Sequence, residues 1–283
     1  MKDLRFYLFT LCWLVFCLCA ISYQNAFFVR LIPSFYLPSY PVSEPLDSQQ
    51  FENFKQNCFN EFKRLFDFDQ YQKLSDSDLL KHATITSQEQ LKQFNINLNS
   101  KLTKIKYLSG VPRILGLSYG GIAYHDLFTG EIVIPTKEDY PTTLFFRAVM
   151  IFHEIGHAFY HADDVQNSIF QAHAMISSKH PVIQSLGYLF ILQYTDYPMW
   201  TQIETYHPKL YNEMVTQQRL NMELRSKRKA IKSFKRILTK VKIQNNDVKY
   251  GYDNFYLNNV YLRSIIDKVD DNLKRKEVVQ HDK

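Results

Sequence analysis

Two histidines and a glutamate are the part of the sequence with the clearest potential for chemistry. His153 and His157 are four residues apart, and Glu154 directly follows the first of them. On an α-helix, residues at positions i and i+4 share a face, so both imidazole rings can reach one metal ion. Zinc accepts neutral imidazoles in a tetrahedral set that leaves one position open for water. The spacing therefore predicts a Zn²⁺ site with His153 and His157 as ligands.

Glu154 has a different task in this pattern, because its carboxylate reaches the metal-bound water rather than the metal. Zinc lowers the pKa of that water towards neutrality, and the glutamate takes its proton and passes it to a leaving amine. We therefore predict that Glu154 is the catalytic general base of a metallopeptidase acting on a peptide or protein. The alternative is an ordinary helix with two hydrogen-bonded histidines. Three such side chains in an otherwise apolar helix are costly without a function.

The residues around the motif resemble a known enzyme family. The run from His153 to Phe159 is similar to the zinc-binding helix of the metzincin peptidases, the matrixins in particular. Residues 160–170 look like the continuation to their third histidine, an aspartate and the Met-turn. The resemblance implies a zincin-like domain with His161 as the third zinc ligand. Two positions depart from the family: Tyr160 replaces its glycine, and Phe170 replaces the methionine of the Met-turn.

The third ligand has an alternative within the same segment. Asp163 occupies the third-ligand position of the matrixin spacing, and His161 arrives two residues early. If the helix runs on, His161 lies about 12 Å along the axis from His153 and cannot share its metal. A break in the helix at residue 159 or 160 would let either side chain swing in. We predict His161, with Asp163 as the second choice.

A gluzincin-type site is the structural competitor, because it takes a glutamate from a later helix. Glu204 is the best-placed candidate for that ligand, ahead of Glu213. Two non-enzymatic alternatives also stay open. One is a catalytically silent, membrane-tethered binding domain, and the other is an adaptor that acts at a membrane surface through its basic C-terminal helix.

The elements around the motif predict an α+β fold in which a small sheet packs on the helix that carries it. Thr142 or Thr143 can cap an apolar helix from Leu144 to His157. Short strands, with glycine turns at 120–121 and 129–130, are predicted over 104–108, 113–119, 122–124 and 131–134. Helices are predicted over 51–66, briefly around Leu79 after the capping sequence at 75–78, and over 182–192 and 210–242.

The N-terminus predicts a membrane segment. After Lys2 and Arg5, residues 6–21 contain a single polar side chain. The residues before Ala20 make a poor cleavage site, which favours an uncleaved signal anchor over a signal peptide. The positive charges before the apolar run predict a single-pass protein whose catalytic domain lies outside the cytoplasm, or a secreted one if the segment is cleaved.

Composition excludes several other classes. The chain has 283 residues, of which 46% are hydrophobic and 22% charged, so it is neither disordered nor fibrous. Cys58 is the only cysteine outside the N-terminal run, so we expect neither a disulfide framework nor a cysteine-ligated zinc site. Residues 209–283 hold 18 Lys and Arg against 9 Asp and Glu, while the whole chain carries +6. No recognisable module accompanies this charge, so nucleic-acid binding is not expected.

Four segments follow from these patterns. We expect a signal anchor or signal peptide over 1–32 and a proline-rich linker over 33–50. A zincin-like metallopeptidase domain should then cover 51–208, and a basic helical region 209–283.

Overall fold

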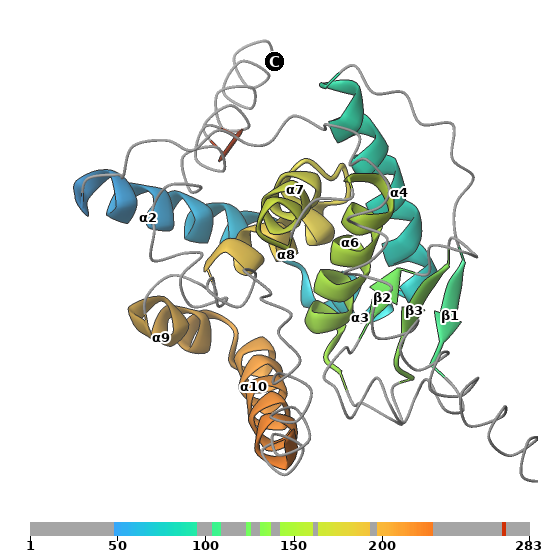
Figure 1. Cartoon of the computed structure of the whole chain (residues 1–283). Coiled ribbons are helices and arrows are strands. Elements are labelled where there is room, and N and C mark those ends of the chain that lie inside the picture. Colours follow the sequence, from blue (N-terminus) through green and yellow to red (C-terminus); the bar gives the residue numbers. More distant parts are fainter. Residues whose placement is uncertain are drawn as a thin grey trace, which may run out of the picture. The chain divides into compact units, whose positions relative to one another are not determined.

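The computed structural model describes residues 48–94, 104–108, 123–125, 131–136, 142–160, 164–192, 197–228 and 268–269 (Figure 1). These residues form helices and one small sheet, which agrees with the predicted α+β class. The predicted membrane segment, the strand over 113–119, both glycine turns and the basic stretch beyond Arg228 lie outside the described residues. Within the described part of the chain, no helix is both long and apolar enough to cross a membrane.

The described sheet has three short strands in the order β1–β3–β2. β1 (Ile105–Tyr107) runs parallel to β3 (Ile132–Ile134), and β2 (Tyr124–His125) runs antiparallel to it. All three residues of β3 are buried, as expected for a central strand. The strands predicted at 104–108 and 131–134 are confirmed with slightly shorter bounds, and β2 begins at the last residue of the strand predicted over 122–124.

α6 (Leu144–Tyr160) carries the histidine motif and packs against the sheet and mainly against two helices, α4 (Asp76–Lys92) and α7 (Asp164–Ile176). The predicted cap is confirmed at Thr143, whose Oγ1 accepts a hydrogen bond from the backbone N–H of Phe146 at 3.2 Å. The helix is longer than predicted, because it continues beyond His157 to Tyr160. The apolar face of α6 is part of the core and is buried at Phe145, Ala148, Ile151, Phe152 and Ile155.

Two other helices hold the first turn of α6. Tyr71, on α3 (Phe68–Lys73), accepts a hydrogen bond from the backbone N–H of Phe145 at 2.9 Å and donates one to Glu213 Oε2 at 2.7 Å. Burial, and then the nearby Glu213 carboxylate, raises the pKa of Tyr71, so the hydroxyl keeps the proton that it donates. Gln217 accepts from the N–H of Thr143 at 2.9 Å. Glu213 and Gln217 both belong to α10 (Pro208–Arg228), so α3 and α10 together supply partners for the start of α6.

The remaining helices complete the core. α8 (Pro181–Leu192) lies in the predicted apolar stretch and is buried at all but two of its residues, Pro181 and Gln184. It packs against α7 (Asp164–Ile176) and against α2 (Ser48–Leu65), which confirms the helix predicted over 51–66. α9 (Tyr197–Tyr206) packs on α10, and α10 confirms the predicted basic helix as far as Arg228.

α4 (Asp76–Lys92) corrects the expectation of a short helix. Its start is as predicted, because Ser75 and Asp78 form a reciprocal capping box. The helix then continues for 17 residues, although the sequence pattern indicated only its first turns. The reason is that much of its buried face is small or polar and gives little hydrophobic periodicity, at Ala83, Thr84, Thr86, Ser87 and Gln90.

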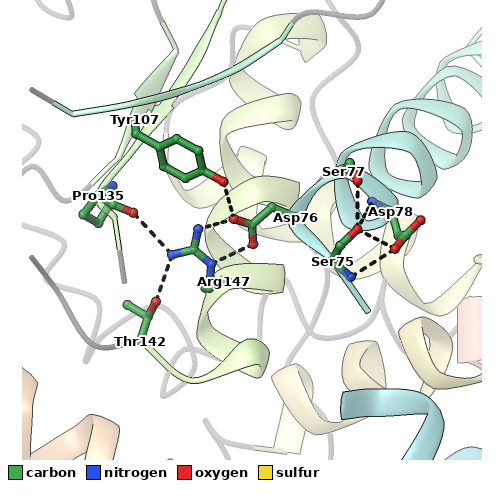
Figure 2. Close-up of polar contacts among 8 residues, drawn as sticks. All are labelled: Ser75, Asp76, Ser77, Asp78, Tyr107, Pro135, Thr142 and Arg147. Carbon is green, nitrogen blue, oxygen red and sulfur yellow. Dashed lines mark hydrogen bonds and ion pairs between the residues drawn. The ribbon is translucent and has the colours of Figure 1, made fainter. Parts of the chain in front are cut away.

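A buried ion pair ties α4 to α6 (Figure 2). The Arg147 guanidinium donates to both carboxylate oxygens of Asp76, with Nε 2.7 Å from Oδ1. Its remaining nitrogen, Nη1, donates to the carbonyl oxygen of Pro135 and to Thr142 Oγ1. Tyr107 on β1 donates to the same carboxylate at 2.9 Å. The side chain of Arg147 is 1% exposed, so this network connects helix, sheet and loop with little access to water.

We expect Arg147→Met to lower the free energy of unfolding by about 3 kcal/mol, because it leaves the Asp76 carboxylate without its counter-charge. Asp76 keeps the hydroxyl of Tyr107 and some solvent contact, which places the effect at the lower end of the range for broken buried pairs. Lys179→Met is the matched control, since it removes an exposed pair with Glu89 and should cost at most about 1 kcal/mol. Urea unfolding measures both, and equal costs would contradict the prediction.

Candidate metal centre

The two motif histidines face one another on α6. His153 Nε2 and His157 Nε2 are 3.1 Å apart, and the two rings meet edge to face. Two nitrogens that bind a tetrahedral zinc ion at about 2.0–2.1 Å would be separated by about 3.3–3.4 Å. The pair therefore fits two ligands of one zinc ion after a shift of a few tenths of an ångström. The helical spacing predicted this shared face, and the fold places both residues on it.

Glu154 is buried on the same turn of α6, with 7% of its surface exposed. None of the ion pairs among the described residues involves this carboxylate. Burying a carboxylate without a counter-charge is costly, and a cation bound at the neighbouring histidines would reduce that cost.

α7 places two polar side chains behind the histidines. Asn167 and Gln171 are four residues apart, so they share the face of α7 that packs on α6. Asn167 Nδ2 donates to the backbone oxygen of His153 at 2.8 Å. Gln171 Oε1 lies 3.2 Å from His153 Nδ1, and Gln171 Nε2 donates to the backbone oxygen of Val149 at 2.9 Å. These side chains therefore hold both the ring and the backbone of His153.

Sequence analysis missed Asn167 and Gln171 as members of this site. The available signal was a pair of side-chain amides, Asn167 and Gln171, which are four residues apart and stand among apolar residues after the motif. The resemblance directed attention elsewhere, because it treated residues 167–170 as the approach to a Met-turn. That expectation is wrong: these four residues lie inside α7, and Phe170 is fully buried in the middle of the helix.

Gly156 explains how α7 comes so close to α6. A Cβ atom at this position would lie 2.0 Å from Asn167 Oδ1, well inside any contact distance. Only glycine therefore lets the Asn167 side chain reach the backbone of His153. The glycine inside the motif has a packing role that is separate from the chemistry of its neighbours.

Both candidates for a third ligand lie outside the described residues. His161 and Asp163 fall between the end of α6 at Tyr160 and the start of α7 at Asp164, in residues that the structure does not describe. The described residues themselves contain no group of three or more His, Cys, Asp or Glu side chains that could hold a metal ion. Among the described residues, His153 and His157 are therefore not joined by a third side chain of these types.

Glu204 and Glu213, the candidates of the gluzincin alternative, do not lie with the histidine pair in this structure. Glu204 is exposed on α9, and Glu213 accepts a hydrogen bond from Tyr71 at the start of α6. Both side chains are described, and neither joins the histidine pair in a possible metal-binding group. The helix that returns across the site is α7 instead, and it brings amides rather than a glutamate.

No protein-family model matches this chain, and no curated protein or solved structure shows significant similarity to it. A function for this chain therefore has to be inferred from the arrangement of side chains around His153 and His157.

Proposed function

We propose that this chain is a zinc-dependent metallopeptidase that hydrolyses peptide bonds in a peptide or protein substrate. The observation that carries the proposal is the 3.1 Å separation of His153 Nε2 and His157 Nε2 on one face of α6. The buried Glu154 and the amide acceptor of Gln171 behind the first histidine support it. Metal-ligating histidines commonly donate their second ring N–H to such an acceptor.

In this proposal His153, His157 and His161 hold the metal, with Asp163 as the second choice for the third position. A third imidazole would make a neutral ligand set and leave the full charge of the ion to act on water. In the sequence, His161 comes directly after the end of α6 and Asp163 directly before the start of α7. The metzincin resemblance is retained for the helix of the motif alone, since residues 167–170 are helical.

Bound zinc supplies a Lewis acid that polarises the substrate carbonyl and acidifies water. Glu154 takes the proton of the attacking water and delivers it to the nitrogen of the departing amine. Its burial excludes bulk water, which would otherwise compete for the carboxylate. Among the described strands β2 lies at one edge of the sheet and packs against α6, so an extended substrate could add beside it by β-strand pairing.

The membrane segment over residues 1–32 belongs to the same proposal. It would anchor the chain as a single-pass protein and place the catalytic domain outside the cytoplasm. Substrates would then be peptides or proteins of that compartment.

Metal analysis of the purified full-length chain tests the proposal. We expect one zinc per chain, together with hydrolysis of a peptide library that phenanthroline abolishes and added zinc restores. Magnesium should not restore it, because imidazole ligands favour zinc over that hard cation. A correctly folded chain that neither contains nor takes up zinc would contradict the enzyme and favour the silent binding domain.

A further inference from the structure

We infer that Gln171 fixes the tautomer of His153 and is thereby the positioning residue of this site. The tautomer follows from hydrogen bonds among described residues alone. Its consequence for metal binding rests on the proposed function.

The orientation of the Gln171 amide is set by its partner on α6. The backbone oxygen of Val149 can only accept a hydrogen bond, so the end of the amide that lies 2.9 Å from it must be the NH₂ group. The oxygen of the same amide then points at His153 Nδ1, at 3.2 Å. Because an amide oxygen also only accepts, Nδ1 must carry the proton of the neutral ring.

This assignment leaves the lone pair of His153 on Nε2, the nitrogen that faces His157. A zinc ligand has to present a lone pair at that position, and the opposite tautomer would point a hydrogen at the metal. Gln171 therefore selects the tautomer that can bind before any metal arrives. The neighbouring bond from Asn167 to the His153 backbone oxygen holds the turn that carries the ring.

The hydrogen bond between Gln171 and His153 is in a position to maintain this tautomer. Gln171 is 1% exposed, so water has little access to replace its oxygen at Nδ1. Its second bond, to Val149, reaches the turn of α6 that precedes His153, and prevents the amide from turning over. Replacing Gln171 with alanine removes the acceptor while leaving the apolar contacts of α7 in place.

The tautomer can be measured without metal. Long-range proton–nitrogen NMR of the full-length, metal-free chain, labelled at histidine nitrogens, distinguishes the two tautomers above the titration range of histidine. We expect the His153 signal, identified by its loss in His153→Ala, to show protonated Nδ1. Gln171→Ala should shift it to a mixture of both tautomers. Gln171→Glu should keep Nδ1 protonated, because one carboxylate oxygen accepts there even though the variant loses the bond to the Val149 oxygen.

Gln90→Ala provides the matched control. Gln90 on α4 makes another buried glutamine–histidine contact, in which the amide nitrogen Nε2, not the oxygen, lies 3.2 Å from Nδ1 of His173 on α7. Its loss should loosen the packing of α7, here against α4, to a similar degree and leave the His153 signal unchanged. An equal response to both alanine variants would overturn the inference, since it would mean that general loosening of α7 causes the change.

Zinc titration of the same proteins separates the role of Gln171 from the proposal that the chain is a metallopeptidase. Gln171→Ala should bind zinc about 10–100-fold more weakly than the wild type, while Gln171→Glu and Gln90→Ala stay within about tenfold. A wild-type His153 that carries its proton on Nε2 overturns the inference, whether or not zinc binds. A wild-type His153 protonated on Nδ1 in a chain that binds no zinc supports the role of Gln171 and refutes the metallopeptidase. Should Gln171→Ala fail to fold, Gln171→Met takes its place, because it fills a similar volume without an amide oxygen at Nδ1.

Discussion

Glu154→Gln should keep the fold and the zinc and lower peptide hydrolysis by at least about 10²-fold. The amide has almost the same shape as the carboxylate but cannot accept the proton of the attacking water. Because Glu154 is buried and outside the described ion pairs, replacing its charge removes no salt bridge of the described core. The loss should therefore appear in kcat, with zinc content and thermal unfolding close to those of the wild type.

Glu204→Gln is the control for that experiment. It makes the same chemical change at an exposed position on α9 and should leave activity unaltered. Turnover by Glu154→Gln at the wild-type rate would end the assignment of the general base. Loss of zinc in that variant would show instead that Glu154 is a ligand, and the motif would then have to be interpreted differently.

The sequence was informative where the physical signal is local. The apolar run from 144 to 157 and the threonine before it were sufficient to predict α6, because a helix needs a buried face and a capped first turn. The spacing of His153 and His157 placed both on one face for the same reason. The strands predicted at 104–108 and 131–134 also rest on local pattern and turn chemistry, and both are present.

What the sequence could not supply depends on packing between distant segments. The length of α4 was missed because its buried face includes Thr84, Ser87 and Gln90, which pack against α6 and α7 without a hydrophobic repeat. Gln171 was missed because its importance comes from lying opposite His153, on another helix. The resemblance to the metzincins was misleading in the same region, because it predicted a turn near residues 167–170. These residues are instead part of the buried face of α7.

The largest expected effect concerns the ligands themselves. Zinc affinity should drop by orders of magnitude in His153→Ala and in His157→Ala, because each removes one of few bonds to the metal. We expect a comparable loss in His161→Ala and only about a 10–100-fold loss in Asp163→Ala, as for a residue that orients a ligand. Competition titration against a zinc chelator measures all four, with circular dichroism to confirm that each variant is folded.

Glu204→Ala completes the series as the variant that should retain wild-type affinity, since its side chain is exposed on α9. If Asp163→Ala loses zinc and His161→Ala does not, the aspartate is the third ligand. The site would then carry one negative charge, and its bound water would be less acidic than in a site with three imidazoles. Activity would consequently rise only at higher pH, so the pH profile of the wild-type enzyme provides a second measurement of whether the histidine or the aspartate is the third ligand.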